Sequence, residues 1–61
     1  MKINVHCNLT NGDMFDKVIK VLAVPRQGES LWLDDKDVRG QFDVSNVTHE
    51  RGKIEIVAYQ Q

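Results

Sequence analysis

Hydrophobic and polar residues alternate over much of this 61-residue chain. The clearest alternation runs from Lys2 to Leu9, where every second residue is apolar or a cysteine. A period of two residues is typical of a half-buried β-strand, whose side chains point to its two faces in turn. The same pattern returns in residues 30–33, 41–49 and 53–59, and we expect a strand in each.

Residues 14–24 fit two periods. Four apolar residues have the i, i+3, i+4, i+7 spacing of an amphipathic helix, namely Phe15, Val18, Ile19 and Leu22. The segment is also rich in β-branched residues, and it follows Asn11-Gly12, the pair that most strongly indicates a β-hairpin turn. We therefore predict a strand, one suited to the centre of a curled sheet, and keep a helix as the alternative.

Two features interrupt the alternation. Pro25 fixes its own φ and, with Gly28 three residues later, predicts a corner between two apolar runs. Farther on, the apolar positions slip by one residue after Val44, which indicates a β-bulge at Ser45–Asn46. Five short strands with one bend cover a small core best when the sheet curls on itself. The predicted fold is all-β, one domain over residues 1–61, a small five-stranded SH3-like half-open barrel.

A resemblance supports this fold. The residues that carry it are Val24-Pro25-Arg26-Gln27-Gly28-Glu29, then Leu31 and Leu33, then the run from Phe42 to His49, then Ile54 and Ile56. This pattern resembles that of small uncharacterised phage and bacterial proteins with SH3-like β-barrels. It covers about the C-terminal two thirds of the chain. The resemblance implies a fold and a phage or mobile-element origin, and it implies no catalytic residue.

Composition narrows the classes of function. Eight basic and nine acidic residues are mixed along the chain, which argues against a surface that binds polyanions. A single cysteine excludes an internal disulfide, and a domain this small has a marginal core, so we expect a homo-oligomer. The chain has neither a long apolar run nor a signal-peptide pattern. A cytoplasmic protein that does not bind membranes is therefore expected.

The sequence offers little support for a catalytic or metal-binding site. His6 and Cys7 are neighbours on a strand, so they point to opposite faces and cannot form a catalytic pair. Cys7 is expected in the core, and His49 at the end of a strand beside a turn. A zinc site from His6 and His49 lacks the usual ligand spacing. The acidic run 34–37 is predicted to be a polar turn rather than a cation site, so we expect no enzyme, cofactor or metal.

The outward positions suggest an interaction surface. If the leucines beside it point inward, Trp32 points outward, and by the same rule Val57 and Tyr59 point away from the core. Aromatic residues of this kind are favoured at the centres of protein interfaces. The sequence thus predicts a non-enzymatic protein-interaction module that binds a protein partner, most simply a second copy of itself. The alternative is a single-stranded nucleic-acid-binding barrel, using Trp32 and Tyr59 with the basic residues Arg26, Arg39, Arg51 and Lys53.

Overall fold

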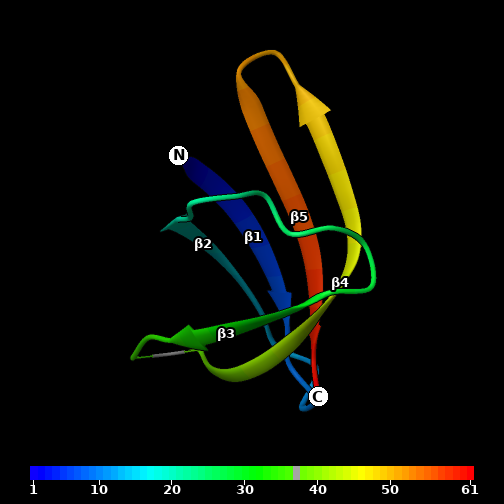
Figure 1. Cartoon of the computed structure of the whole chain (residues 1–61). Coiled ribbons are helices and arrows are strands. Elements are labelled where there is room, and N and C mark those ends of the chain that lie inside the picture. The colour runs from blue at the N-terminus through cyan, green and yellow to red at the C-terminus, as the bar shows by residue number, and fades with distance from the viewer. Residues whose placement is uncertain (37) are drawn as a thin grey trace.

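The computed structural model describes residues 1–36 and 38–61, which form one curled β-sheet of five strands (Figure 1). The strands are β1 (Lys2–Asn8), β2 (Met14–Lys20), β3 (Ser30–Asp34), β4 (Arg39–Glu50) and β5 (Lys53–Gln60). Their order across the sheet is β2-β1-β5-β4-β3. The described residues contain no helix, and therefore none that could cross a membrane. The all-β, five-stranded, half-open architecture predicted from the sequence is confirmed.

The first hairpin forms around Asn11-Gly12, as predicted. The backbone N–H of Leu9 donates to the carbonyl of Asp13 at 2.8 Å, and the Asp13 N–H donates to Oδ1 of Asn11 at 2.9 Å. Gly12 has a φ of 95°, a backbone conformation that glycine adopts without strain. This turn sends residues 14–20 back beside β1 as a strand, so the helical alternative for this segment is wrong.

Two expectations for residues 14–24 need correction. The strand ends at Lys20, and β2 lies at an edge of the sheet rather than at its centre. The reason is a pairing between strands that are far apart in the sequence. One edge of β1 pairs with β2, and its other edge pairs in parallel with β5, from Asn4↔Glu55 to Asn8↔Tyr59. The hairpin therefore places β2 outside β1, and no other strand pairs with it.

The predicted bulge in β4 is confirmed. The β4–β5 register shifts between Val44 and Asn46, so one residue of β4 has no partner on β5. Such a bulge bends its strand and increases the twist of the sheet. Beyond it, β4 continues to a tight turn at Arg51–Gly52 and returns as β5. The lower part of β4 can therefore curl toward β3 while its upper part stays beside β5 (Figure 1).

The core fills the concave side of this sheet. Its buried members come from four strands and the turn before β4: Ile3, Val5, Cys7, Leu33, Val38, Phe42, Val44, Ile56 and Ala58. Residues 21–29 cross over that side from β2 to β3 (Figure 1), and Val21 and Val24 pack against the core. The predicted corner is present there, because the Glu29 N–H donates to the Arg26 carbonyl at 3.0 Å around Gly28, whose φ is 90°.

The barrel stays open between its two edge strands. β2 and β3 are not paired with each other, and their inward apolar side chains Phe15, Ile19 and Leu31 are only half-buried. An ion pair crosses this opening: Nζ of Lys17 on β2 lies 3.3 Å from Oδ2 of Asp35, in the turn after β3. Asp37, part of the predicted acidic turn, lies outside the described residues.

Candidate interaction surface

The outer face of the sheet, which is turned away from the core, carries the predicted surface residues. On β3 the half-buried Leu31 and the buried Leu33 point inward, and Trp32 between them is 70% exposed. On β5 Ile56 and Ala58 are buried, and Tyr59 next to them is 51% exposed. Strand alternation therefore places an indole and a phenol on the same side of the sheet.

Val57 is half-buried on the same face of β5, two residues before Tyr59. Across the strands, Tyr59 lies opposite Asp43 of β4, whereas Trp32 lies opposite Gln41. Trp32 and Tyr59 are thus separated by two strand spacings and two residues, roughly 12 Å between their Cα atoms. The three predicted residues share one face, on which Val57 and Tyr59 are neighbours and Trp32 stands across β4.

Asp43 of β4 lies on this face between β3 and β5, where it pairs with Ser30 and Tyr59. Its Oδ1 accepts a hydrogen bond from the Ser30 hydroxyl at 3.1 Å and another from Nε2 of Gln61 at 2.5 Å. One carboxylate thereby joins β3, β4 and the residue after β5. Beside Trp32, Nε of Arg39 donates to Oδ1 of Asp34 at 3.0 Å. Paired polar groups thus lie beside and between the exposed aromatic rings, as polar groups do next to the apolar anchors of protein interfaces.

Sequence reasoning missed two further apolar residues of this face. Met14 and Val18 point outward from β2 and are 75% and 65% exposed. With Trp32 and Tyr59 they make four of the six large apolar side chains exposed in the described part of the chain. The alternation of residues 14–20 indicates that Met14 and Val18 point outward. It does so only if the segment is taken as a strand rather than a helix.

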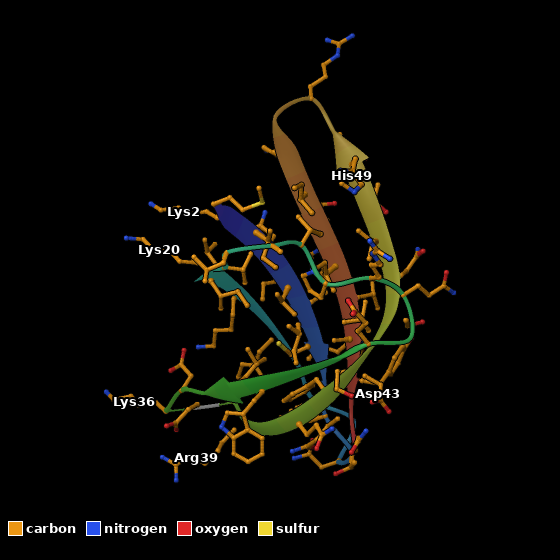
Figure 2. The ribbon with its side chains drawn as sticks, in the orientation of Figure 1. Lys2, Lys20, Lys36, Arg39, Asp43 and His49 are labelled. Carbon is orange, nitrogen blue, oxygen red and sulfur yellow. The ribbon has the colours of Figure 1, made fainter. Side chains whose placement is uncertain are left out.

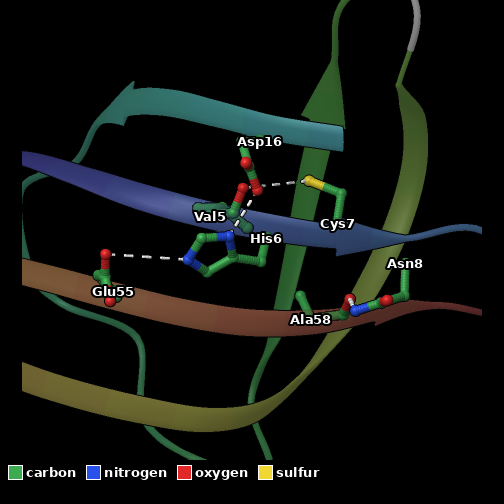
Figure 3. Close-up of polar contacts among 7 residues, drawn as sticks. All are labelled: Val5, His6, Cys7, Asn8, Asp16, Glu55 and Ala58. Carbon is green, nitrogen blue, oxygen red and sulfur yellow. Dashed lines mark hydrogen bonds and ion pairs between the residues drawn. The ribbon is translucent and has the colours of Figure 1, made fainter. Parts of the chain in front are cut away.

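A polar group ties β1 to both of its neighbours (Figure 3). Nδ1 of His6 lies 2.5 Å from Oδ1 of Asp16 on β2, and Nε2 lies 4.0 Å from Oε1 of Glu55 on β5. The side-chain amide of Asn8 donates to the carbonyl of Ala58 at 3.2 Å. An imidazole held between two carboxylates cross-links three strands, and these contacts orient the ring along the outer face.

Cys7 points to the opposite face, as predicted (Figure 3). Its side chain is buried in the core, and Sγ lies 3.8 Å from the carbonyl of Val5, to which the thiol donates. Burial raises the pKa of the Cys7 thiol, although the nearby Lys17 charge opposes this effect. A neutral buried thiol is a poor nucleophile, since the thiolate is the reactive form.

The other candidates for chemistry are dispersed. His49 is exposed on the inward-facing side of β4, near the end of that strand, far along the sheet from His6. It lines a hollow of about 350 Å³ with Pro25 and Arg26 among others. Across residues 1–36 and 38–61, no group of three or more His, Cys, Asp or Glu side chains is placed to hold a metal ion.

The basic residues proposed for nucleic-acid binding also separate in space. Arg39 is paired with Asp34 beside Trp32, whereas Arg51 lies in the turn at the far end of β4 and Lys53 begins β5 there. A single platform of aromatic and basic side chains is therefore not formed by these residues. The pairing of β1, β2 and β5 instead gathers lysines that sequence reasoning left unused, Lys2 and Lys20 with Lys53.

Comparison with known proteins returns no match: neither a family model, a curated protein nor a solved structure matches this chain. The resemblance to SH3-like phage and bacterial proteins therefore stays a prediction, and the functional argument depends on the geometry of the chain itself.

Proposed function

We propose that this chain is a non-enzymatic protein-interaction module that self-associates through its outer face, with Trp32, Val57 and Tyr59 as the contact residues. The observation that carries the proposal is the 70% exposure of Trp32. Tryptophan buries 150–250 Å² when it is covered, more than almost any other side chain, so leaving it in water forgoes a large hydrophobic stabilisation. A protein partner that covers the indole recovers this stabilisation.

The partner we propose is a second copy of the chain. Its accessible surface is 4503 Å², whereas a folded monomer of its 7.0 kDa mass is expected to expose about 4,000 Å². The curled sheet is open between two edge strands that each pair on one side only, and its core has nine buried members among the described residues. Covering the outer face of one copy with that of another adds apolar burial that a 61-residue chain cannot supply alone.

The electrostatics of the face allow this contact. Asp34 of β3 and Asp43 of β4 lie on the same face as Trp32. Asp34 accepts a hydrogen bond from Arg39, and Asp43 accepts hydrogen bonds from Ser30 and Gln61. A carboxylate that keeps its partners costs less to cover than an unpaired one. Like-charge repulsion between two identical faces is also reduced. We therefore propose Trp32 as the centre of the contact and the Asp34–Arg39 pair as part of its rim.

The test is the oligomeric state as a function of protein concentration, measured by sedimentation or light scattering. Trp32→Ala is expected to weaken the assembly by about 2 kcal/mol or more, roughly a 30-fold increase in the dissociation constant. Circular dichroism should show that the variant remains folded, because the indole lies outside the core. Leu22→Ala is the matched control: Leu22 is fully exposed but belongs to the loop after β2, and its loss should leave the assembly unchanged.

Three outcomes would overturn the proposal. The wild-type chain could stay monomeric up to millimolar concentration. The control could weaken assembly as much as Trp32→Ala does, which would indicate non-specific hydrophobic association. The Trp32→Ala variant could unfold, which would place the indole in the stabilising core. A reducing, cytoplasmic location suits the proposal, because the one thiol, Cys7, is buried and forms no cross-link.

A further inference from the structure

The end of the sheet far from Trp32 carries a row of lysines. Lys2 of β1 lies directly opposite Lys20 of β2. The parallel pairing of β1 and β5 begins at Asn4 and Glu55, and beyond it Lys2 and Lys53 line the same hollow between the two strand ends. Like charges on facing positions of neighbouring strands destabilise a sheet. Three lysines on adjacent strands therefore indicate a local arrangement that an anion would stabilise.

Glu50 and Glu55 are the carboxylates next to this row in the strand pairing. In the described part of the chain, none of the ion pairs involves Lys2, Lys20 or Lys53. Figure 2 shows Lys2 and Lys20 extending side by side from the ends of their strands. Arg51, in the adjacent turn, adds a fourth positive charge, and Glu50 contributes one negative charge.

The net charge of the whole chain does not reveal that positive charge is concentrated at this end of the sheet. These four basic side chains together with Glu50 and Glu55 carry a net charge of +2, whereas the entire chain has −1, so the remaining residues carry −3. The molecule is thus positive at one end and negative over the rest. A field of this kind attracts polyanions to the positive end and orients them as they approach.

Two hollows adjoin the lysine row. One, of about 190 Å³, is lined by Lys2, Asn4 and Lys53 among others. The other, of about 540 Å³, shares Lys2 and Lys53 and adds His49. They flank the place where β1 and β5 cease to pair and their ends diverge (Figure 1). The side chains of Lys2, Asn4 and Lys53 therefore bring cationic and neutral hydrogen-bond donors to one hollow at this end of the sheet.

We propose that this end, formed by Lys2, Lys20, Lys53 and Arg51, binds the phosphate backbone of a single-stranded nucleic acid. Lysine ammonium groups suit phosphate oxygens, to which they offer three donors and a full charge. Tryptophan and tyrosine are absent from these strand ends, so no such aromatic ring can stack on the bases there. The protein therefore contacts the phosphate backbone, and binding is independent of base sequence. A phosphate of a flexible strand can enter the hollow that Lys2 and Lys53 line, whereas the flat surface of a lipid bilayer cannot.

This inference goes beyond self-association, since it uses different residues at the other end of β4. The two activities can therefore fail separately. Assembly is expected to survive substitution of the lysines, and nucleic-acid binding is expected to survive Trp32→Ala.

The test uses the full chain and a fluorescent 20-nucleotide single strand, with binding followed by anisotropy. If each of the four basic residues contacts one phosphate, log K should fall with log[salt] with a slope of about −3. Each of Lys2→Gln, Lys20→Gln and Lys53→Gln should lower the affinity about eightfold at 50 mM salt and reduce the slope by about 0.7. Lys36→Gln is the matched control, with the same charge change in the turn after β3, and should retain nearly all of the affinity.

Circular dichroism of each variant gives a fold check; we expect all to remain folded, because the three lysine side chains are exposed. Equal losses in Lys36→Gln and Lys2→Gln would overturn the site, since they would show attraction to the whole molecule rather than to this end. Absence of binding at 50 mM salt would also overturn it. Binding to vesicles containing phosphatidylserine with no binding to the oligonucleotide would assign the lysines to a membrane surface and reject the proposal.

Discussion

At the scale of single residues, the strand alternation separates two kinds of side chain that are adjacent in the sequence. His6 lies on the outer face between Asp16 and Glu55, and Cys7 lies in the core. Trp32 is separated in the same way from the leucines on either side of it. The direction of each of these side chains could be predicted from the sequence, because the period of a strand is two and an inward neighbour fixes the next residue outward.

Burial of the Cys7 thiol predicts a pH dependence. Its pKa is raised, so above the ordinary thiol pKa of 9.0 the unfolded chain loses this proton while the folded chain keeps it. Stability due to Cys7 is therefore complete below that pH and is lost as the pH rises through the raised value. Urea unfolding between pH 8 and 10.5 should show a steeper loss for the wild type than for Cys7→Ala. Parallel slopes in the two proteins would contradict this prediction.

At the scale of elements, the opening between β2 and β3 is where the sheet departs from a closed barrel. The Lys17–Asp35 ion pair spans this opening, with 3.3 Å between Nζ and Oδ2. The backbone N–H of Lys36 and the Lys17 ammonium both lower the pKa of Asp35. Strand positions and the β4 bulge followed from the sequence, but the contact between an edge strand and a distant turn did not, because it joins residues 18 positions apart without a local pattern.

Asp35→Asn removes the charge while leaving an oxygen that can accept the Lys36 N–H. Because the pKa of Asp35 is lowered, its stabilising effect is present above the usual carboxyl pKa of 3.8 and disappears as the pH falls through the lowered value. The melting temperature of the wild type should exceed that of Asp35→Asn at pH 7, and the difference should shrink below pH 4. In a Lys17→Met background the same substitution should have a smaller effect at pH 7, and an equal effect would show that the ion pair is not responsible.

At the scale of the whole molecule, the fold combines a thin core with a strongly asymmetric charge distribution. The principal extents are 32, 22 and 17 Å, so much of the chain is close to solvent. Phe42 is the largest of the fully buried side chains. The lysine row and the exposed indole lie at opposite ends of β4, which allows an assembly contact and an anion site to coexist on one small domain.

Removing the largest core side chain should nearly abolish folding. A 61-residue domain is expected to have about 3–9 kcal/mol of stability, and Phe42→Ala should cost about 3–5 kcal/mol through lost burial and the cavity left behind. Denaturant titration followed by circular dichroism measures this loss. Leu22→Ala, which removes a fully exposed apolar side chain, should change stability by less than about 0.5 kcal/mol. Comparable losses in the two variants would show that Phe42 is not a central core residue.

The sequence alone determined the elements: alternation predicted the strands and their inward faces, Asn11-Gly12 the first hairpin, and the slip after Val44 the bulge. These features are local, because turn conformation and strand period depend on residues close together in the chain. Only the tertiary structure decided that β1 pairs in parallel with β5. That pairing joins residues about 50 positions apart, moved β2 to an edge and gathered Lys2, Lys20 and Lys53. Mixed charges along a chain can thus become a single basic end, since strand pairing rather than sequence distance decides which side chains are neighbours.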